Sequence, residues 1–267
     1  MFLIKAMIDF LIVLLLVRLL IRPVEANFNQ IYSLIYRISD YVLKPVKSIV
    51  HSDFKSVLLS VLGLVLIRGL IYIGMGRFTL LTGIGLSFLN LFQLMFQFYM
   101  VVWFIIILTG DRTNTPVISV LQRAFLPLGS LSSKLNIPRK SFSIFSFVFL
   151  LVTYSLLSFI LYSVIARGPF SASFNFLSSV VEGLILIIDL FPGFFSVIII
   201  VGALLSWVSP DPYNPVVQTI YGISEPLLMP FRKIIPNLGG LDISPIAALL
   251  CFQIIGGQLI GLLKQIL

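Results

Sequence analysis

The sequence predicts an all-α membrane protein with about six transmembrane helices, arranged as three repeats of helix, interfacial loop and helix. Of its 267 residues, 59% are hydrophobic and only 10% are charged, whereas a soluble domain carries about 25% charged residues. Six stretches are long and apolar enough to cross about 30 Å of hydrocarbon. The three long loops that join these stretches in pairs are similar in length and share residues at fixed spacings.

The predicted spans follow the apolar stretches in chain order, each about 20 residues long, as a rise of about 1.5 Å per residue requires. The fourth span contains no charged residue. An apolar segment at 176–187 precedes the fifth span, and Pro192 and Gly193 interrupt this region. We therefore expect a short interfacial helix before the fifth span. The six spans are residues 1–21, 56–75, 88–109, 143–165, 189–208 and 245–265.

The basic residues predict the orientation of the chain. The long loops at 22–55, 110–142 and 209–244 hold 12 of the 18 Lys and Arg residues, and the segments on the opposite side hold four. Basic loops stay on the cytoplasmic side of a membrane. We expect the long loops in the cytoplasm and both termini outside. The net charge of +8 then indicates contact with anionic lipid headgroups, with no direct role for nucleic acid.

The first and third long loops predict an internal repeat, because an Asn, an acid and a base recur in them at the same spacing from one another. The middle loop is a degraded copy, in which Gln122 replaces the acid and Gly129 replaces the base. The predicted repeats are residues 1–75, 76–175 and 176–267. The matched pairs are Asn29 and Asn214, Asp40 and Glu225, Lys47 and Arg232, and, after a short gap in the alignment, Asp53 and Asp242.

The third loop predicts a kinked ledge on the membrane surface. Asn214-Pro215 is a helix start, because Asn accepts from free N–H groups and Pro suits the first helical position. The helix is expected to cover 215–224 and to stop at Glu225, since Pro226 disfavours helical geometry at the residue before it. Later residues are expected to break the chain, to turn it and to cap the last span. They are Pro230, Pro236, Gly239, Gly240, Ser244 and Pro245.

Two acid–base pairs, Glu225 with Arg232 and Asp40 with Lys47, are candidate ion pairs of these loops. The favoured interpretation is a salt bridge that clamps the ledge across its break. Binding of a partner or of lipid is the alternative. General acid–base catalysis is disfavoured, because no nucleophile or second acid is visible nearby.

Charged residues inside the spans predict a further pair. Asp9 lies as far before position 21, the cytoplasmic end of the first span, as Arg68 lies past position 56, the start of the second. Antiparallel neighbours would place both at one depth, so we expect an Asp9–Arg68 pair. Arg18 lies near the end of its span and is expected to extend to the headgroups.

The inventory of reactive residues argues against an enzyme. Cys251 is the only cysteine and His51 the only histidine, which removes disulfides within the chain and metal sites built from several cysteines or histidines. We expect no catalytic residue, no cofactor and no metal ion.

The third loop closely resembles the signature of the YGGT (YlmG-like) family. The close match covers roughly residues 195–265, the 1–75 region matches at fewer positions, and the middle repeat departs from the pattern. A common form of the family has two repeats, so a third is a departure. The matching residues are Ser206-Trp207, Asn214-Pro215, Glu225-Pro226-Leu227-Leu228, Pro230, Arg232, Ile235-Pro236, Gly239-Gly240, Asp242 and Ser244-Pro245.

The resemblance implies a non-enzymatic protein of the bacterial inner membrane, with a plastid membrane as the alternative location. Bacterial members of the family are associated with osmotic tolerance, potassium uptake and cell-division genes, and plastid members with nucleoid distribution and cytochrome assembly. We expect a scaffold or assembly factor for membrane complexes. The alternative is an ion channel or transporter component that affects potassium uptake. Expected partners are the bilayer and other membrane proteins, and a homo-oligomer is left open.

Overall fold

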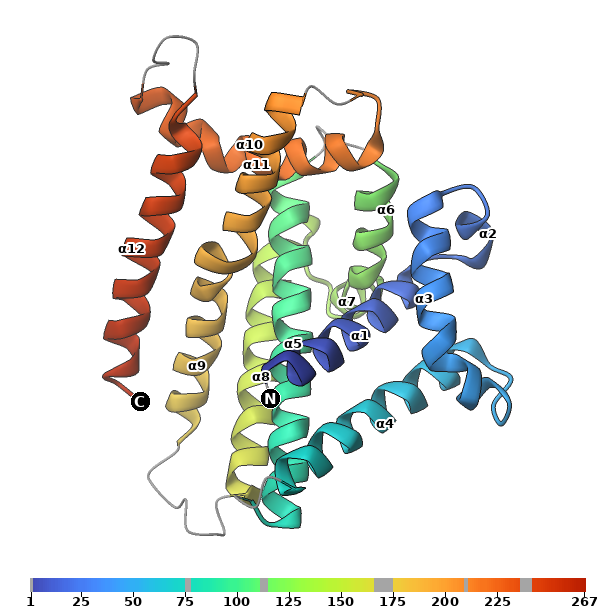
Figure 1. Cartoon of the computed structure of the whole chain (residues 1–267). Coiled ribbons are helices and arrows are strands. Elements are labelled where there is room, and N and C mark those ends of the chain that lie inside the picture. The colour runs from blue at the N-terminus through green and yellow to red at the C-terminus, as the bar shows by residue number, and fades with distance from the viewer. Residues whose placement is uncertain (1, 75–77, 111–114, 166–174, 209–210, 236–241) are drawn as a thin grey trace. The chain divides into compact units, whose positions relative to one another are not determined.

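The computed structural model describes residues 2–74, 78–110, 115–165, 175–208, 211–235 and 242–267. These residues form helices and no strand, as the composition predicts. Figure 1 shows the course of the helices. The chain divides into two compact units, one within Met1–Met95 and Ile160–Ser173 and the other within Phe96–Phe159 and Phe174–Leu267.

The first unit is built around the N-terminal helices, whose apolar sides form two neighbouring clusters. Ile8 and Ile12 pack with Val65 and Leu91 in one of them. In the other, Leu15 packs with two further buried side chains, Leu43 and Val57. The helices of this unit are α1 (Phe2–Leu20), α2 (Pro23–Ala26), α3 (Gln30–Lys47), α4 (Asp53–Gly74) and the start of α5 (Leu80–Thr109).

The second unit holds the rest of α5 and the helices that follow it, apart from the end of α8 from Ile160 onward, which belongs to the first unit. Aromatic rings tie its long helices together: Phe104 of α5 lies 5.3 Å from Phe191, whose ring lies 5.4 Å from Phe252. The elements are α6 (Pro116–Gln122), a 3-10 turn (Arg123–Phe125), α7 (Leu126–Lys134), a second 3-10 turn (Arg139–Ser141), α8 (Phe142–Ile165), α9 (Phe176–Asp189), a π-helical turn (Phe191–Phe195), α10 (Ser196–Val208), α11 (Pro215–Ile234) and α12 (Ser244–Lys264).

Five helical segments among the described residues are long and apolar enough to cross a membrane. They begin and end close to the second to sixth predicted spans, apart from earlier starts of the third and fifth. The first predicted span forms α1, a helix of 19 residues, but it carries Lys5, Asp9 and Arg18 and is not among the five. The five segments are Asp53–Gly74, Leu80–Thr109, Arg139–Ile165, Phe176–Val208 and Ser244–Lys264.

The prediction of a separate interfacial helix before the fifth span was wrong. The chain is helical from Phe176 to Val208 and takes up Pro192 in a π-helical turn. Proline has no N–H to donate to the preceding turn, and a π-turn is one way in which a helix accommodates such a local defect. Side chains bind the carbonyls near this turn: Gln253 donates to Pro192 O at 3.0 Å, and Ser196 donates to Phe191 O at 2.8 Å.

The predicted helix stop at Glu225 was also wrong. Helix α11 runs on to Ile234, 20 residues in all, with Pro226 and Pro230 inside it. Its buried face, which includes Val217, Ile223 and Leu227, runs past Pro226 as far as Leu228. Beyond Pro230, the Phe231 ring contacts Phe252 of α12. Tertiary packing of an amphipathic face outweighs the local cost of a proline here. Within the second unit, α11 lies crosswise at one end of α10 and α12 (Figure 1).

Candidate functional site

The third loop forms a cluster of three charged side chains, Glu225, Arg232 and Asp242, called here the C-terminal ion cluster. The Arg232 guanidinium lies between the two acids: NH1 is 2.6 Å from Glu225 Oε2, and Nε is 2.8 Å from Asp242 Oδ2. Asp242 also accepts the backbone N–H of Ser244 at 2.9 Å. The cluster therefore joins the body of α11 to the start of α12.

The surroundings of Arg232 and Asp242 shift their pKa values toward the charged forms. The hydrogen bond to Glu225 raises the pKa of Arg232, against the effect of burial. Burial opposes the charge on Asp242, but the hydrogen bonds from Ser244 and Arg232 together outweigh it, so the pKa of Asp242 lies below its ordinary 3.8. Both shifts favour the charged forms of Arg232 and Asp242. A permanently ionised carboxylate in a salt bridge is suited to holding structure and poorly suited to proton transfer.

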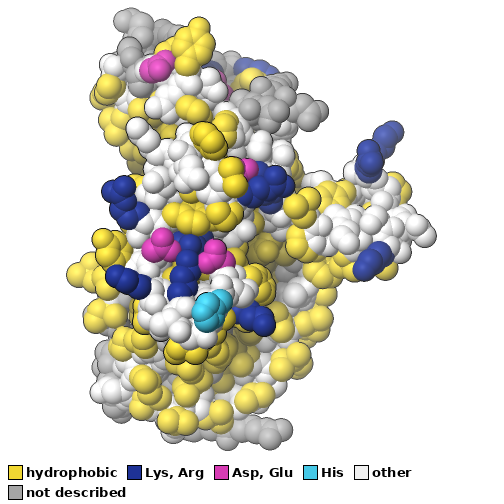
Figure 2. Space-filling model, turned by 90° about the vertical axis from the view of Figure 1, so that its right-hand side faces the viewer, with side chains coloured by type: hydrophobic (Ala, Val, Ile, Leu, Met, Phe, Trp, Pro, Cys, Tyr) yellow, Lys and Arg dark blue, Asp and Glu magenta, His cyan; other side chains and the backbone are white. Residues whose placement is uncertain are grey.

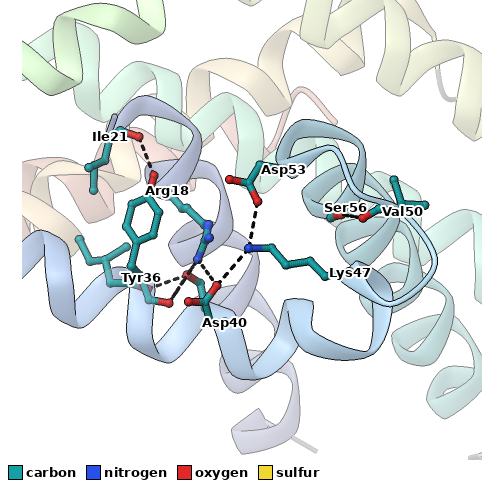
Figure 3. Close-up of polar contacts among 10 residues, drawn as sticks. Arg18, Ile21, Tyr36, Asp40, Lys47, Val50, Asp53 and Ser56 are labelled. Carbon is teal, nitrogen blue, oxygen red and sulfur yellow. Dashed lines mark hydrogen bonds and ion pairs between the residues drawn. The ribbon is translucent and has the colours of Figure 1, made fainter. Parts of the chain in front are cut away.

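The first loop builds a matching cluster from Asp40, Lys47 and Asp53, called here the N-terminal ion cluster. Lys47 Nζ lies 3.4 Å from Asp40 Oδ1 and 2.9 Å from Asp53 Oδ1, and Figure 3 shows the lysine between the two acids. It joins α3 to the start of α4. On the face drawn in Figure 2, acidic side chains likewise flank basic ones close to the histidine. In each loop, one base thus links an acid on the loop's own helix, α3 or α11, to an acid at the start of the following helix, α4 or α12.

Arg18 adds a second base to the N-terminal ion cluster, which the sequence did not predict. Its NH1 lies 2.8 Å from Asp40 Oδ1, 2.6 Å from Ser39 Oγ and 3.2 Å from the carbonyl of Tyr36. Its guanidinium carbon stands 4.1 Å from the centre of the Tyr36 ring. Only 4% of the Arg18 side chain is exposed. The expectation that Arg18 extends to the headgroups was wrong, because α3 supplies these partners.

The predicted pair inside the helices is present. Arg68 NH1 of α4 lies 2.5 Å from Asp9 Oδ1 of α1, and only 1% of the Arg68 side chain is exposed. Ser87 of α5 completes the arrangement, because its Oγ and its carbonyl accept from Arg68 at 2.9 Å and 2.6 Å. A buried guanidinium needs several acceptors. Sequence reasoning missed Ser87, since nothing in the spacing shows which side of α5 faces α4.

The remaining predicted residues of the third loop occupy helix starts. Asn214 accepts the N–H of Val216 at 2.9 Å and caps α11, with Pro215 in the first turn. Pro245 lies in the first turn of α12, but Ser244 is the first helical residue and does not cap it. The capping oxygen comes from Asp242 instead. Three predicted residues, Pro236, Gly239 and Gly240, lie outside the described residues.

A cavity of about 660 Å³ adjoins the C-terminal ion cluster, between the last turns of α10, the middle of α11 and the first turns of α12. We call it the C-terminal cavity. Its wall is mostly apolar, and its charged residues are those of the cluster. Among the described residues, no three His, Cys, Asp or Glu side chains are placed to hold a metal ion.

Comparison with known proteins gives a family match that includes the C-terminal ion cluster. The sequence pattern of the CCB3/YggT family matches residues 181–263. An uncharacterised protein of Pseudomonas aeruginosa is 51% identical over 72 residues, which are 27% of this chain and 36% of that protein. An uncharacterised protein encoded in the proC 3′ region of Vibrio alginolyticus is 28% identical over 153 residues, 56% of this chain and 75% of that protein.

The uncharacterised protein YggT of Escherichia coli K12 is 34% identical over 58 residues, 22% of this chain and 30% of that protein. The matched segment thus spans only about a third of the Pseudomonas and Escherichia relatives. No solved structure matches this chain.

Proposed function

Because this chain is a YGGT-family membrane protein, with the family segment at residues 181–263, we propose that it is a non-enzymatic scaffold for membrane complexes. The supporting observation is how its charged loop residues are used. In each ion cluster one base, Lys47 or Arg232, is held between two carboxylates, and the cluster joins one helix to the start of the next. These charged groups hold helices in position. None of them is paired with a nucleophile as a general base would be.

Helix α11 is the proposed docking shelf. Its buried face packs on its own unit through Ile223, Leu227 and Leu228, while Met229 and Ile234 are exposed at 44% and 80%. Thr115, ahead of α6, supports the other end through a 2.9 Å hydrogen bond with Thr219. A helix that is held at both ends and exposes apolar side chains offers a preformed surface, which lowers the entropy lost when a partner binds.

The location and the repeats are part of the proposal. The relatives named above come from bacteria, which supports a bacterial inner membrane, and the excess of Lys and Arg in the long loops supports their placement in the cytoplasm. The equivalent geometry of the two ion clusters supports the division into repeats, with the middle repeat degenerate.

In-cell photocrosslinking tests the scaffold role. A photoreactive phenylalanine at Met229 should form an adduct with one defined membrane protein, because this position lies on the exposed side of the shelf. The same residue at Tyr213, which is 84% exposed before the start of α11, is the control and should give none.

Potassium flux through liposomes that contain the purified chain tests the alternative. A scaffold predicts no flux above that of empty liposomes. Flux without any adduct from Met229 would contradict the scaffold and favour an ion channel or transporter component.

A further inference from the structure

The N-terminal ion cluster shows how this fold holds a guanidinium group. Arg18, in the last turn of α1, contacts Tyr36 and, one turn further along α3, the adjacent Ser39 and Asp40. Figure 3 shows Arg18 beside Tyr36 and Asp40. The tyrosine ring stacks on the guanidinium, the serine hydroxyl and the tyrosine carbonyl accept from it, and the carboxylate neutralises its charge. This combination of stacking and directed acceptors suits arginine better than lysine.

The third repeat keeps the receiving residues but lacks the arginine. When Asp40 is aligned with Glu225, Tyr36 and Ser39 fall on Tyr221 and Ser224. In the same alignment Ala203 replaces Arg18, within the matched sequences Arg18-Leu19-Leu20 and Ala203-Leu204-Leu205. All of the receiving residues line the C-terminal cavity, and so does Ala203. The cavity therefore lies where the first repeat places a guanidinium.

The buried Ser224 of the cavity wall has only a long hydrogen bond within its own helix. Ser224 is 2% exposed, and its hydroxyl makes a hydrogen bond of 3.5 Å with Tyr221 O of its own helix. The equivalent Ser39 hydroxyl receives Arg18 at 2.6 Å. Gly202 keeps α10 close to α11 here, because a Cβ on this residue would lie 3.0 Å from Ser224 Oγ.

The charges of the two clusters differ by one base. Among the described residues, the N-terminal cluster pairs Arg18 and Lys47 with two acids. The C-terminal cluster has Arg232 alone between Glu225 and Asp242, which leaves a formal charge of −1 at a mostly apolar cavity. A partly desolvated site with an uncompensated charge favours a ligand of opposite charge.

We propose that the C-terminal cavity binds the guanidinium group of an arginine that a membrane helix of a partner protein presents. The partner's helix would take the role that α1 has in the first repeat. The exposed apolar residues Leu204, Trp207 and Ile246, at 51%, 72% and 58%, line the cavity and suit contact with an apolar helix. This inference rests on the proposed scaffold role and gives it a recognition chemistry.

Binding of octylguanidinium to the full chain in phosphatidylcholine nanodiscs tests the site. In a Trp103→Phe background, Trp207 is the only tryptophan and reports on the cavity through its fluorescence. Octylguanidinium should bind and saturate. Glu225→Gln should weaken binding by roughly tenfold or more, because a charge-assisted hydrogen bond is lost. Ala203→Arg should abolish it by filling the cavity from within, and Asp211→Asn, outside the cavity, should leave it unchanged.

The ligand controls separate guanidinium recognition from charge and from apolar contact. Octylammonium should bind more weakly and octanol should not saturate. A leucine-rich membrane-spanning peptide with one arginine near its end should compete with octylguanidinium, and its lysine counterpart should compete less. Equal binding of the ammonium and guanidinium probes, or competition by phosphatidylethanolamine alone, would overturn the proposal.

The first repeat provides an independent test. Arg18→Ala should open a second site of the same kind, so octylguanidinium should raise the Tm of this variant more than that of the wild type. An equal rise in both proteins would contradict the proposed equivalence. A partner captured from Met229 together with no guanidinium binding would reject the cavity proposal and leave the scaffold standing. Guanidinium binding with no captured partner would reject the scaffold instead.

Discussion

At the scale of single residues, the Asp9–Arg68 pair is the most demanding feature of the first unit. Arg68 is almost fully buried, and its hydrogen bonds go to Asp9 and Ser87. Taking a charge out of water is unfavourable, and the attraction to Asp9 offsets this only while both partners are present. The pair therefore ties α1 to α4 and makes each of its members sensitive to substitution.

Asp9→Asn should destabilise the first unit by roughly 3–5 kcal/mol, because it leaves the Arg68 charge buried without its partner. The double variant Asp9→Leu/Arg68→Met should be closer to the wild type than Asp9→Asn is. Thermal unfolding in detergent, with a double-mutant cycle, measures both effects. Additive losses from the two positions would show that the pair is not coupled.

The C-terminal ion cluster should make stability depend on acid pH. Because the pKa of Asp242 is lowered in the folded chain, its contribution is fully present above the ordinary pKa of 3.8 and is lost as pH falls through the lower folded value. The Tm difference between wild type and Asp242→Asn should thus be constant near neutrality and shrink below about pH 3.8. Arg232→Met should flatten this dependence, and a difference that instead grows in acid would contradict the assignment.

Some of these residue contacts could be predicted from the sequence, and others could not. Counting residues to the cytoplasmic ends of the first and second predicted spans placed Asp9 and Arg68 at the same depth, and so predicted their pair. It could not predict that Arg18 turns into a cluster, since an arginine at a helix end satisfies the same pattern by reaching the headgroups. The partners Ser39 and Ser87 depend on how α3 and α5 are rotated about their axes, which the spacing alone does not determine.

At the scale of elements, the helix starts carry specific hydrogen bonds that can be tested. Asn214→Ala should destabilise α11 by about 1 kcal/mol, since the cap to the Val216 N–H is lost. Asn214→Ser keeps an acceptor and should stay close to the wild type. Urea unfolding followed by tryptophan fluorescence gives the difference. An equal loss in both variants would mean that the asparagine acts through something other than its cap.

The same scale shows where proline rules misled the prediction. Pro192, Pro226 and Pro230 each remove a helical hydrogen bond, and the sequence therefore predicted breaks near them. The structure keeps all three inside continuous helical segments. At Pro192 a π-turn and two side-chain donors satisfy nearby carbonyls. In α11 the buried apolar face continues past Pro226 to Leu228, and the Phe231 ring, beyond Pro230, contacts Phe252. The Gln253 donor lies 61 residues from Pro192, and the burial of α11 depends on packing against other helices. Local propensity rules include neither of these effects.

At the scale of the whole chain, the proposed orientation in the membrane can be tested directly. Cysteine accessibility tests the proposed orientation in a Cys251→Ser background. An impermeant maleimide added to intact spheroplasts should fail to label Asn27→Cys or Tyr213→Cys, because the basic loops face the cytoplasm. Leu267→Cys should be labelled from outside. Labelling of the loop cysteines in intact spheroplasts would reverse the orientation.

The most direct measurement of the scaffold account compares photocrosslinking from Met229 in two chains, one with the C-terminal ion cluster intact and one with Arg232→Met. If α11 is a shelf that the cluster holds in place for a partner, the intact chain gives a single protein adduct. The variant, inserted in the membrane at the same level, gives much less of it. An adduct of equal yield in both chains, or labelled lipid alone in the intact chain, would contradict the account.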